Sequence, residues 1–359
     1  MLDRNLLLSA LEARSAEFTH FEHRRQSILQ RLRDALTRLE TRGFAEGLVR
    51  PFATSFRHHP EALAWGQRHL EGWISFAADG SQIEPDNRYS LPVALIQVGT
   101  YENHHLSEGS YRKETMLDVL TPGDLDSEGP VKRLVDLARF ELEIEALIRF
   151  MRERPPEPPC LVYLDGSLIV SFADRDGQDP LASRYVSRIL ALLDTAEETR
   201  TPLIAYVDGS RAKDVVRLVA AESGEEEEGV TDAMLLDGRL NWGDRTAAFR
   251  CERDGVLEGY GRHRREIAFC YLQTREAHPP ARLEFPAWML EGLEPILDAV
   301  RADAIAGGGY PYTLAAADAT AVLTTSDRER FQRTLEDFLS QKAIPLSFGT
   351  KALSKLRRR

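Results

Sequence analysis

The chain has 359 residues, of which 43% are hydrophobic and 29% charged, and its formal net charge is −11 at pH 7. This composition is typical of a globular protein and excludes a disordered or fibrous one. No apolar run reaches the roughly 18 residues that a membrane helix needs, and the N-terminus lacks the pattern of a signal peptide. Three scattered cysteines, without a Cys-x-x-Cys pair, argue against a disulfide framework or a zinc site and favour the cytoplasm.

The acidic balance does not exclude a nucleic-acid partner. A protein that binds metal needs carboxylates, and one local basic groove is enough to contact phosphates. Part of the acidity is concentrated in the run 225–228, which is predicted to be a solvated loop. The opposite charge gathers near the C-terminus, which ends in three arginines.

Residues 1–70 are predicted to be helical, because leucine and isoleucine recur there at spacings of three and four. The same apolar stripe would suit a cap packed on the core or a surface for a second copy or another partner. The sequence does not choose between these two roles. We place the end of this N-terminal region at residue 70 and expect residues 71–359 to form one further domain.

The remainder of the chain alternates apolar strands with amphipathic helices. Strands are predicted at 72–79, 91–101, 110–120, 160–166 and 202–209, and β-rich segments at 245–251, 265–274 and 282–286. Helices are predicted at 131–152, 181–197, 287–306, 314–323 and 327–341. This order of elements predicts an α/β fold with a mixed central sheet flanked by helices.

Three Asp-Gly-Ser triplets occur, at 79–81, 165–167 and 208–210, each after an apolar segment. One such triplet alone is an ordinary turn signal. Asp79 and Asp165 are more informative as a pair, because both are expected at the carboxyl end of a buried strand, where ligands of open sheets bind. If their strands are neighbours, one cation would reach both carboxylates and offset the cost of burying them.

A third carboxylate is expected from the helix between these strands, which carries Glu141, Glu143 and Glu145. Glu141 and Glu145 share a face that Glu143 does not, and each of the three would otherwise be an ordinary solvated side chain. Helix geometry therefore leaves the choice open. Clustered carboxylates suit phosphodiester hydrolysis, because two divalent ions about 3.5–4 Å apart activate water and stabilise the leaving oxygen. Hard oxygen ligands favour Mn²⁺ or Mg²⁺.

An ordered series of segments resembles the NurA nuclease family. It includes the first Asp-Gly-Ser triplet, RFELE (139–143), LDGSL (164–168), PLIAYVDGSRAKDV (202–215), GYPYTLAAAD (309–318) and SFGTKALSK (347–355). The resemblance implies an RNase H-like fold and a manganese-dependent 5′–3′ exonuclease and endonuclease that acts on DNA. It also implies a homodimer and partnership with a hexameric HerA-type ATPase in DNA-end processing and recombinational repair.

The resemblance also assigns ligands position by position. It implies that Asp79 and Asp165 are the central metal ligands, and that Glu143, four residues after Arg139, is the third. At one position the chain departs from the family, because Asp318 stands where a histidine is usual. An aspartate can still bind metal, but it is a poor proton donor near pH 7 unless its pKa is raised. The alternative is that Asp318 is an ordinary helix residue and the site is weakened.

Tyr310 belongs to the glycine-rich turn GGGYP at 307–311. The resemblance implies that this tyrosine lies at the site and orients water or phosphate. Without the resemblance, Tyr310 and Tyr312 would simply be packing residues that follow a turn before a helix.

Four residues are candidates for DNA contacts. In the third triplet Asp208 departs from the family, which often has a lysine there, so it is not expected to be catalytic. Ser210 and Arg211 would contact phosphate at a helix start, or Ser210 would only cap that helix. Lys351 and Lys355 would contact the DNA backbone, or the basic tail is simply solvated.

Two other functions are compatible with the sequence. Phosphotransferases of the actin and sugar-kinase type share the RNase H-like fold and hold ATP phosphates with Asp-Gly turns, although this chain has no Walker-type loop. The aspartate at 318 also leaves open a non-catalytic DNA-binding or scaffold subunit that loads a translocase.

Overall fold

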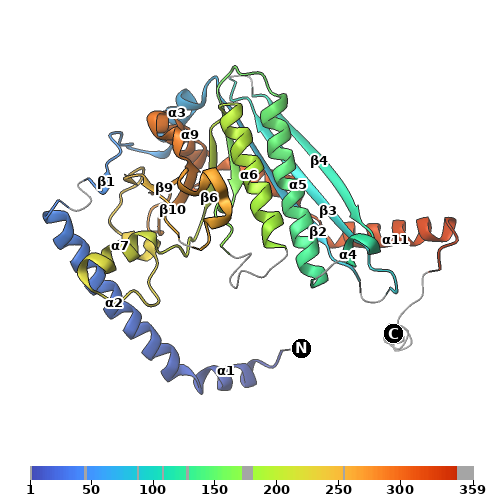
Figure 1. Cartoon of the computed structure of the whole chain (residues 1–359), viewed down its shortest axis with the longest axis horizontal. Coiled ribbons are helices and arrows are strands. Elements are labelled where there is room, and N and C mark those ends of the chain that lie inside the picture. Colours follow the sequence, from blue (N-terminus) through green and yellow to red (C-terminus); the bar gives the residue numbers. More distant parts are fainter. Residues whose placement is uncertain are drawn as a thin grey trace. The chain divides into compact units, whose positions relative to one another are not determined.

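The computed structural model (Figure 1) describes residues 2–43, 47–86, 89–106, 109–126, 129–171, 181–253 and 255–345. The chain divides into two compact units. Unit 1 comprises Met1–Ser55, Val207–Glu252 and Phe269–Leu283, and unit 2 comprises Phe56–Tyr206, Arg253–Ala268 and Glu284–Arg359. In the described part of the chain, no helix is both long and apolar enough to cross a membrane.

Unit 2 is built on the strands β2 (Ile74–Ile83), β3 (Ala94–Asn103), β4 (Tyr111–Leu120), β5 (Cys160–Asp165) and β6 (Leu203–Val207). They follow the order β6-β5-β2-β3-β4. Strand β3 is antiparallel to β2 and β4, whereas β5 is parallel to β2 and β6. One long helix connects β4 to β5 and another connects β5 to β6. This order, with these directions and crossovers, is that of an RNase H-like fold, and it confirms the predicted fold class.

Helices cover both faces of these strands. Helix α5 (Val131–Glu153) packs on β2, β3 and the neighbouring helix α6 (Ala182–Glu198), and α10 (Tyr312–Ala321) also packs on β2 and β3 (Figure 1). A Cβ at Gly80 of β2 would meet side chains of α5, whereas a Cβ at Gly99 of β3 would meet the backbone of α10. Because Gly99 lies opposite Asp79 and successive residues of a strand point to opposite faces, the two helices lie on different sides of the sheet.

The other helices of unit 2 surround these layers. They are α3 (His59–Leu70), α4 (Pro122–Leu125), η1 (Glu258–Arg265), η2 (Ala287–Gly292), α9 (Leu293–Ala306) and α11 (Thr325–Gln341). Helix α9 packs on α3 and on α10. The strands β9 (Ile267–Leu272) and β10 (Ala281–Pro286) are divided between the two units.

Unit 1 contains α1 (Arg4–Glu12), α2 (Ser15–Thr41), α7 (Asp214–Ser223), α8 (Asp232–Leu236) and the short strands β1 (Val49–Arg50), β7 (Arg245–Thr246) and β8 (Phe249–Arg250). Strand β1 pairs with β7, and β7 and β8 pair with β9. Helix α2 packs on α7 and α8 through a stripe that the periodicity predicts, made of Ile28, Leu29, Leu32, Ala35, Leu36 and Leu39.

Three expectations change in detail. The acidic run 225–228 is not merely solvated, because Arg24 and Arg31 of α2 pair with it. The β-rich segment 245–251 shortens to two strands of two residues each. Helices α7 and α8 were not predicted. The domain boundary at residue 70 stays a prediction. The helices before it are divided between the units, with α1 and α2 in unit 1 and α3 in unit 2.

Candidate active site

The register of two parallel strands brings the paired aspartates of unit 2 together. Ala77 of β2 lies opposite Tyr163 of β5, so two residues further along each strand Asp79 and Asp165 reach the same level on the same face. Burial, and then the carboxylates of Asp318 and Asp165, raise the pKa of Asp79 to about 6. The two aspartates therefore form a close pair of like charges.

The sequence predicted that Asp79 would lie at the end of its strand, but β2 continues beyond it. Strand β5 ends at Asp165, whereas β2 continues to Ile83 because β3 pairs with it along its whole length. The first Asp-Gly-Ser triplet is thus part of a strand and not a turn. The triplets at 165–167 and 208–210 do turn the chain, with Gly166 at φ +120° and Gly209 at φ +60°.

Glu143 is the glutamate of α5 that lies beside Gly80, the residue next to Asp79 in β2. Burial raises its pKa to about 7; Arg139 opposes this shift, and the charges of Asp79 and Asp165 add to it. Arg139 Nη1 donates to Glu143 Oε1 at 2.9 Å and to the carbonyl oxygen of Gly80 at 3.1 Å. One arginine therefore links the third carboxylate to the strand that carries Asp79.

The other two glutamates of α5 lie away from the site. Glu141 pairs with Arg184 at 2.6 Å and with Arg188 at 3.5 Å, both on α6. Glu145 is exposed. Of the three glutamates, Glu143 lies on the face of α5 that meets β2, and its role as a metal ligand stays a prediction.

Gly80 makes this approach possible. A Cβ at this position would lie 2.3 Å from Glu143 Oε1 and 2.7 Å from Arg139 Cγ. Such distances are far shorter than any non-bonded contact, so a larger residue would displace the glutamate. Glycine is needed at this position because it has no side chain, and not because of its backbone freedom.

Tyr310 reaches the site from the glycine-rich turn before α10. Its hydroxyl donates to Asp165 Oδ2 at 3.2 Å, and its ring meets that of Tyr206 edge-on at 5.2 Å. The turn needs its glycines, because a Cβ at Gly307 would lie 1.9 Å from the Tyr310 carbonyl oxygen. Burial and the charge of Asp165 both raise the pKa of Tyr310, so the phenol stays neutral and remains a donor.

A family model described as the NurA domain matches residues 75–323, more than half of the chain. The chain belongs to the NurA family. Among solved structures it is similar to the catalytic domain of human endonuclease V, with 12% identity and a TM-score of 0.34 over 89% of this chain and 98% of that one. It is also similar to Argonaute of Aquifex aeolicus, with 11% identity and a TM-score of 0.27 over 70% and 28% of the two chains. Both structural similarities are too weak to carry a functional argument, and no curated protein matches the chain in sequence.

Asp318, at the position where the NurA family usually has histidine, joins the cluster from α10. It is exposed, and a hydrogen bond between its carboxyl and that of Asp79 contributes to the raised pKa of Asp79. Its helix lies unusually close to β3, because a Cβ at Gly99 would be only 2.4 Å from the backbone nitrogen of Ala321. The family resemblance thus names a residue that the fold also brings to Asp79.

Glu284 of β10 is a site residue that the sequence did not reveal. It is only 1% exposed and accepts hydrogen bonds from Ser167 Oγ at 2.7 Å and from the backbone nitrogen of Leu168 at 2.9 Å. These bonds fix the loop that directly follows Asp165. A glutamate within the apolar strand RLEFP was the available signal, since a buried carboxylate requires partners.

None of the four predicted DNA contacts is among the described residues of unit 2. Ser210 and Arg211 belong to unit 1, and Lys351 and Lys355 lie outside the described residues. One interpretation expected Ser210 to cap a helix, but α7 begins four residues after it with Lys213 as its N-cap, and Ser210 Oγ accepts from Ala212 N at 3.2 Å in a local turn.

The chemistry of the cluster fits a hard divalent cation, although the ligands are not yet arranged around one. Within the part of the chain that the structure describes, no group of three or more His, Cys, Asp or Glu side chains has the arrangement of a metal site. Arg139 and Tyr310 instead occupy one oxygen each of Glu143 and Asp165. Carboxylate oxygens are nevertheless the ligands that Mn²⁺ and Mg²⁺ prefer, and a cation would relieve the repulsion between them.

Proposed function

We propose that this member of the NurA family is a metal-dependent deoxyribonuclease that hydrolyses phosphodiester bonds with two divalent ions, Mn²⁺ or Mg²⁺. One observation carries the proposal: Asp79, Glu143 and Asp165 come from three separate elements, and the pKa values of the first two are raised to about 6 and about 7. Structural carboxylates are normally paired with cations inside the protein. Asp79 and Asp165 instead lie side by side, and Glu143, although it pairs with Arg139, adds negative charge beside them. Such crowding favours an external cation.

The residues of the cluster divide the work. Asp79 and Asp165 would hold the ions, and Glu143 and Asp318 would complete their coordination. Bound ions activate water and stabilise the leaving oxygen. Tyr310, as a neutral donor 3.2 Å from Asp165, would keep that carboxylate oriented and hydrogen-bond a phosphate oxygen. Arg139 would hold the backbone of β2 in place when Glu143 turns to the metal.

The decisive experiment compares Asp79→Ala, Asp165→Ala and Glu143→Gln with Glu141→Gln on the same helix. We expect the first three to reduce Mn²⁺-dependent cleavage of linear duplex DNA by about a thousandfold, since metal stabilisation contributes several kcal/mol. Glu141→Gln should cleave at nearly the normal rate. Undiminished cleavage by folded Asp79→Ala or Asp165→Ala protein would remove the mechanism.

A non-catalytic scaffold is the second candidate, and the aspartate at the family's histidine position favours it. Asp318→His separates the two functions. If the chain is an active nuclease, the histidine should change the rate or the metal preference of an existing activity. If the chain is a scaffold, wild-type protein should cleave nothing, with or without its ATPase partner, and still bind that partner. Tight binding of Mg-ATP in a calorimeter would instead favour the phosphotransferase.

For the cellular role we propose 5′–3′ processing of DNA ends in the cytoplasm, for recombinational repair, together with a HerA-type hexameric ATPase. The membership in the NurA family supports this, and α1 supports a partner surface. Helix α1 has no buried residue and exposes four leucines, Leu6, Leu7, Leu8 and Leu11. Removal of residues 1–13 should abolish co-purification with the ATPase, whereas end-labelled substrates would report the polarity.

We further propose that the chain is a homodimer paired through β4. This strand lies at an edge of the sheet, and all of its residues except Met116 and Leu120 are exposed. Antiparallel pairing of two copies about Thr115 would put Arg112 opposite Asp118 and Tyr111 opposite Val119, with no like charges facing each other. Light scattering measures the molar mass. Thr115→Pro should convert a dimer to a monomer, whereas Leu218→Lys, at an exposed position of α7, should leave the dimer intact.

A further inference from the structure

Three tyrosine rings and one lysine form a cluster on one face of the sheet in unit 2. Tyr101 of β3 is buried, and its ring centroid lies 5.7 Å from that of Tyr111 on β4 and 5.8 Å from that of Tyr312, the first residue of α10. Lys113 Nζ lies 5.6 Å from the centroid of the Tyr101 ring and 5.9 Å from that of Tyr111. We call these four residues the tyrosine platform.

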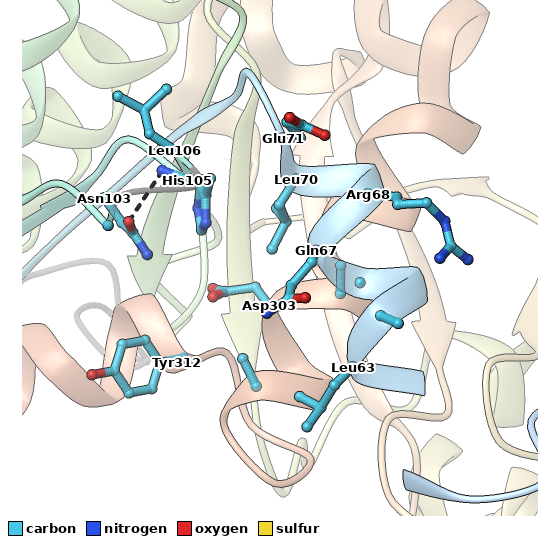
Figure 2. A pocket seen from close by; sticks show the side chains of 15 residues that line it. Leu63, Gln67, Arg68, Leu70, Glu71, Asn103, His105, Leu106, Asp303 and Tyr312 are labelled. Carbon is cyan, nitrogen blue, oxygen red and sulfur yellow. Dashed lines mark hydrogen bonds between the residues drawn. The ribbon is translucent and has the colours of Figure 1, made fainter. Parts of the chain in front are cut away.

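The two outer rings of the platform are open to solvent. Tyr111 is 64% exposed and Tyr312 is 41% exposed, and Figure 2 shows the phenol of Tyr312 directed away from Asp303 and from α3. Lys113 is exposed as well. Apolar surfaces that are exposed together, and not singly, mark interaction sites. The buried ring of Tyr101 thus holds two exposed rings and an ammonium group beside one another.

This face of the two outer strands carries no negative charge. Because successive residues of a strand point to opposite faces, the face of β4 is made of residues 111, 113, 115, 117 and 119, of which Lys113 alone is charged. The two carboxylates of this strand, Glu114 and Asp118, point to the opposite face. The matching residues of β3, at 97, 99, 101 and 103, are uncharged. In a chain whose net charge is −11, such a surface suits an anion that also has flat apolar parts.

The platform lies on the same side of the sheet as Asp79. Gly99 is opposite Asp79 in the register of β2 and β3, and Tyr101, two residues further along, points to the same face and is opposite Lys113. With about 4.8 Å between strands and about 3.4 Å per residue, the backbones at Lys113 and Asp79 are roughly 12 Å apart. The glycine-rich turn that carries Tyr310 leads directly into the residue of α10 that belongs to the platform.

We propose that the tyrosine platform binds single-stranded DNA, with bases stacked on Tyr111 and Tyr312 and a phosphate bound by Lys113. Aromatic rings and cations are the two components with which proteins bind single strands without reading their sequence. Duplex DNA would not stack in this way, because its bases already stack on one another. Such binding rests on the proposed action on DNA, and it identifies the substrate that reaches the carboxylates as an unpaired strand.

The proposed pairing of two copies through β4 is compatible with this role. Pairing would use the backbone at the edge of the strand, whereas side chains stand roughly perpendicular to a sheet. The rings of the platform would therefore stay open in a dimer.

Fluorescence anisotropy of the full chain with a labelled oligothymidine of about twelve nucleotides tests the proposal. A chelator is present, so that binding is measured without cleavage. We expect Tyr111→Ala to weaken binding by about fivefold to a hundredfold, the range for the loss of one stacked base. Tyr111→Phe keeps the ring and should bind as the wild type does. A duplex of the same length should bind more weakly, with an affinity that Tyr111→Ala does not change.

The contribution of Lys113 is measured by the dependence of binding on salt. For a single strand, each phosphate contact adds about 0.7 to the slope of log affinity against log salt concentration, so Lys113→Met should lower the slope by about this amount. Arg112→Met is the matched control, because Arg112 is exposed on the opposite face of the same strand and pairs with Glu114. It should leave the slope unchanged.

Leu117→Ala is the matched control for the aromatic ring, because Leu117 is 63% exposed on the same face of β4, and it should leave binding unchanged. Undiminished binding by Tyr111→Ala, or equal binding of the single strand and the duplex, would overturn the proposal. An equal loss in Leu117→Ala would also overturn it and would make this face a surface for another protein. The nuclease mechanism is tested separately, since a chain that binds the single strand through Tyr111 and cleaves no DNA would keep the platform and lose the hydrolysis.

Discussion

Buried carboxylates occur in both units of the molecule, but they are treated in opposite ways. In unit 1, Arg282 is 1% exposed and its Nη1 lies 2.9 Å from Asp214 Oδ2 and 3.9 Å from Asp232 Oδ2. The guanidinium also stacks on Phe269 at 3.8 Å. Asp232 accepts further hydrogen bonds of 2.8 Å from Val216 N and from the Tyr271 hydroxyl. These negative charges are neutralised and hydrogen-bonded within the protein.

In unit 2, the carboxylates of the candidate active site crowd together with less compensation. Arg139 reaches Glu143, and Asp165 receives a hydrogen bond from the uncharged Tyr310. Burial raises the pKa of Asp79 to about 6 and that of Glu143 to about 7, and neighbouring carboxylates add to both shifts. Burial raises the pKa of Asp232 in unit 1 to about 6 as well, so the two clusters differ in their internal cations and donors and not in this shift. The comparison separates carboxylates that a buried arginine binds from two aspartates, Asp79 and Asp165, that the strand register brings side by side and that suit an external cation. Such a site lowers the stability of the protein for the sake of activity.

The largest effect is expected from breaking the compensated cluster. Arg282→Met leaves Asp214 and Asp232 buried without their cation and should lower the free energy of unfolding of unit 1 by about 3–5 kcal/mol. Urea unfolding followed by circular dichroism measures it. Arg31→Met, which removes only an exposed pair with Glu225, is the matched control and should cost less than about 1 kcal/mol. Equal losses in the two variants would contradict the distinction.

At the active site, in contrast, a substitution is expected to increase the free energy of unfolding. Glu143→Gln removes a carboxylate whose pKa is raised from 4.5 to about 7, so at pH 8 the metal-free variant should be more stable than wild type by up to about 3 kcal/mol. A raised pKa means that ionisation opposes folding. The wild type therefore loses this stability as the pH rises from about 4.5 through 7, and the variant does not.

Urea unfolding of both proteins at pH 4.5 and pH 8, with a chelator present, measures the difference. It should nearly vanish at pH 4.5, where the glutamate is protonated in the folded chain and about half protonated in the unfolded chain. Glu141→Gln, which loses its pair with Arg184, should instead be slightly less stable than wild type at both pH values. A destabilised Glu143→Gln protein at pH 8 would show that the pair with Arg139 outweighs the crowding.

Added metal should offset the stability that the ionised carboxylates of the active site cost. At about a hundredfold excess over its dissociation constant, Mn²⁺ should stabilise the folded chain by about 2.7 kcal/mol. The effect should be larger at pH 8 than at pH 5.5, because protonated carboxylates bind metal poorly. Melting curves with and without Mn²⁺ compare the gain in stability of the wild type with that of Asp79→Asn. A similar gain in the variant would place the ion elsewhere.

Much of this site follows from local patterns in the sequence. Short apolar runs bounded by turns predicted β5 and β6 within two residues of their observed ends. The repetition of Asp-Gly-Ser after such runs pointed to Asp79 and Asp165, which the parallel register of β2 and β5 does bring together. Patterns of this kind depend on residues near one another in the chain, which is why they can be recognised without a structure.

Other features depend on how distant elements cross. The face of α5 that meets β2 decides between Glu141 and Glu143, and helix periodicity does not contain that information. Gly80 held the missing clue, since its role is to let Glu143 approach. Glu284 looks like a single polar residue in an apolar strand, and only tertiary contacts reveal that it binds Ser167 and Leu168 in the loop after Asp165. Periodicity predicted the stripe of α2, but nothing in the sequence indicated that three distant segments assemble into unit 1.

The smallest of these effects concerns the hydrogen bond that Tyr310 donates to Asp165. Tyr310→Phe removes a neutral hydrogen bond of 3.2 Å at a partly exposed position, which contributes about 1 kcal/mol. We therefore expect DNA cleavage to slow by about fivefold to tenfold, with little change in stability, because the ring still packs edge-on against Tyr206. Steady-state rates measured over a range of Mn²⁺ concentrations locate the loss. If Tyr310 only orients Asp165, more metal should restore the rate, whereas a direct bond from the phenol to the phosphate would leave the variant slow at saturating metal. A loss as large as that of Asp165→Ala would mean that the tyrosine takes part in the chemistry itself and that the site depends on more than crowded carboxylates.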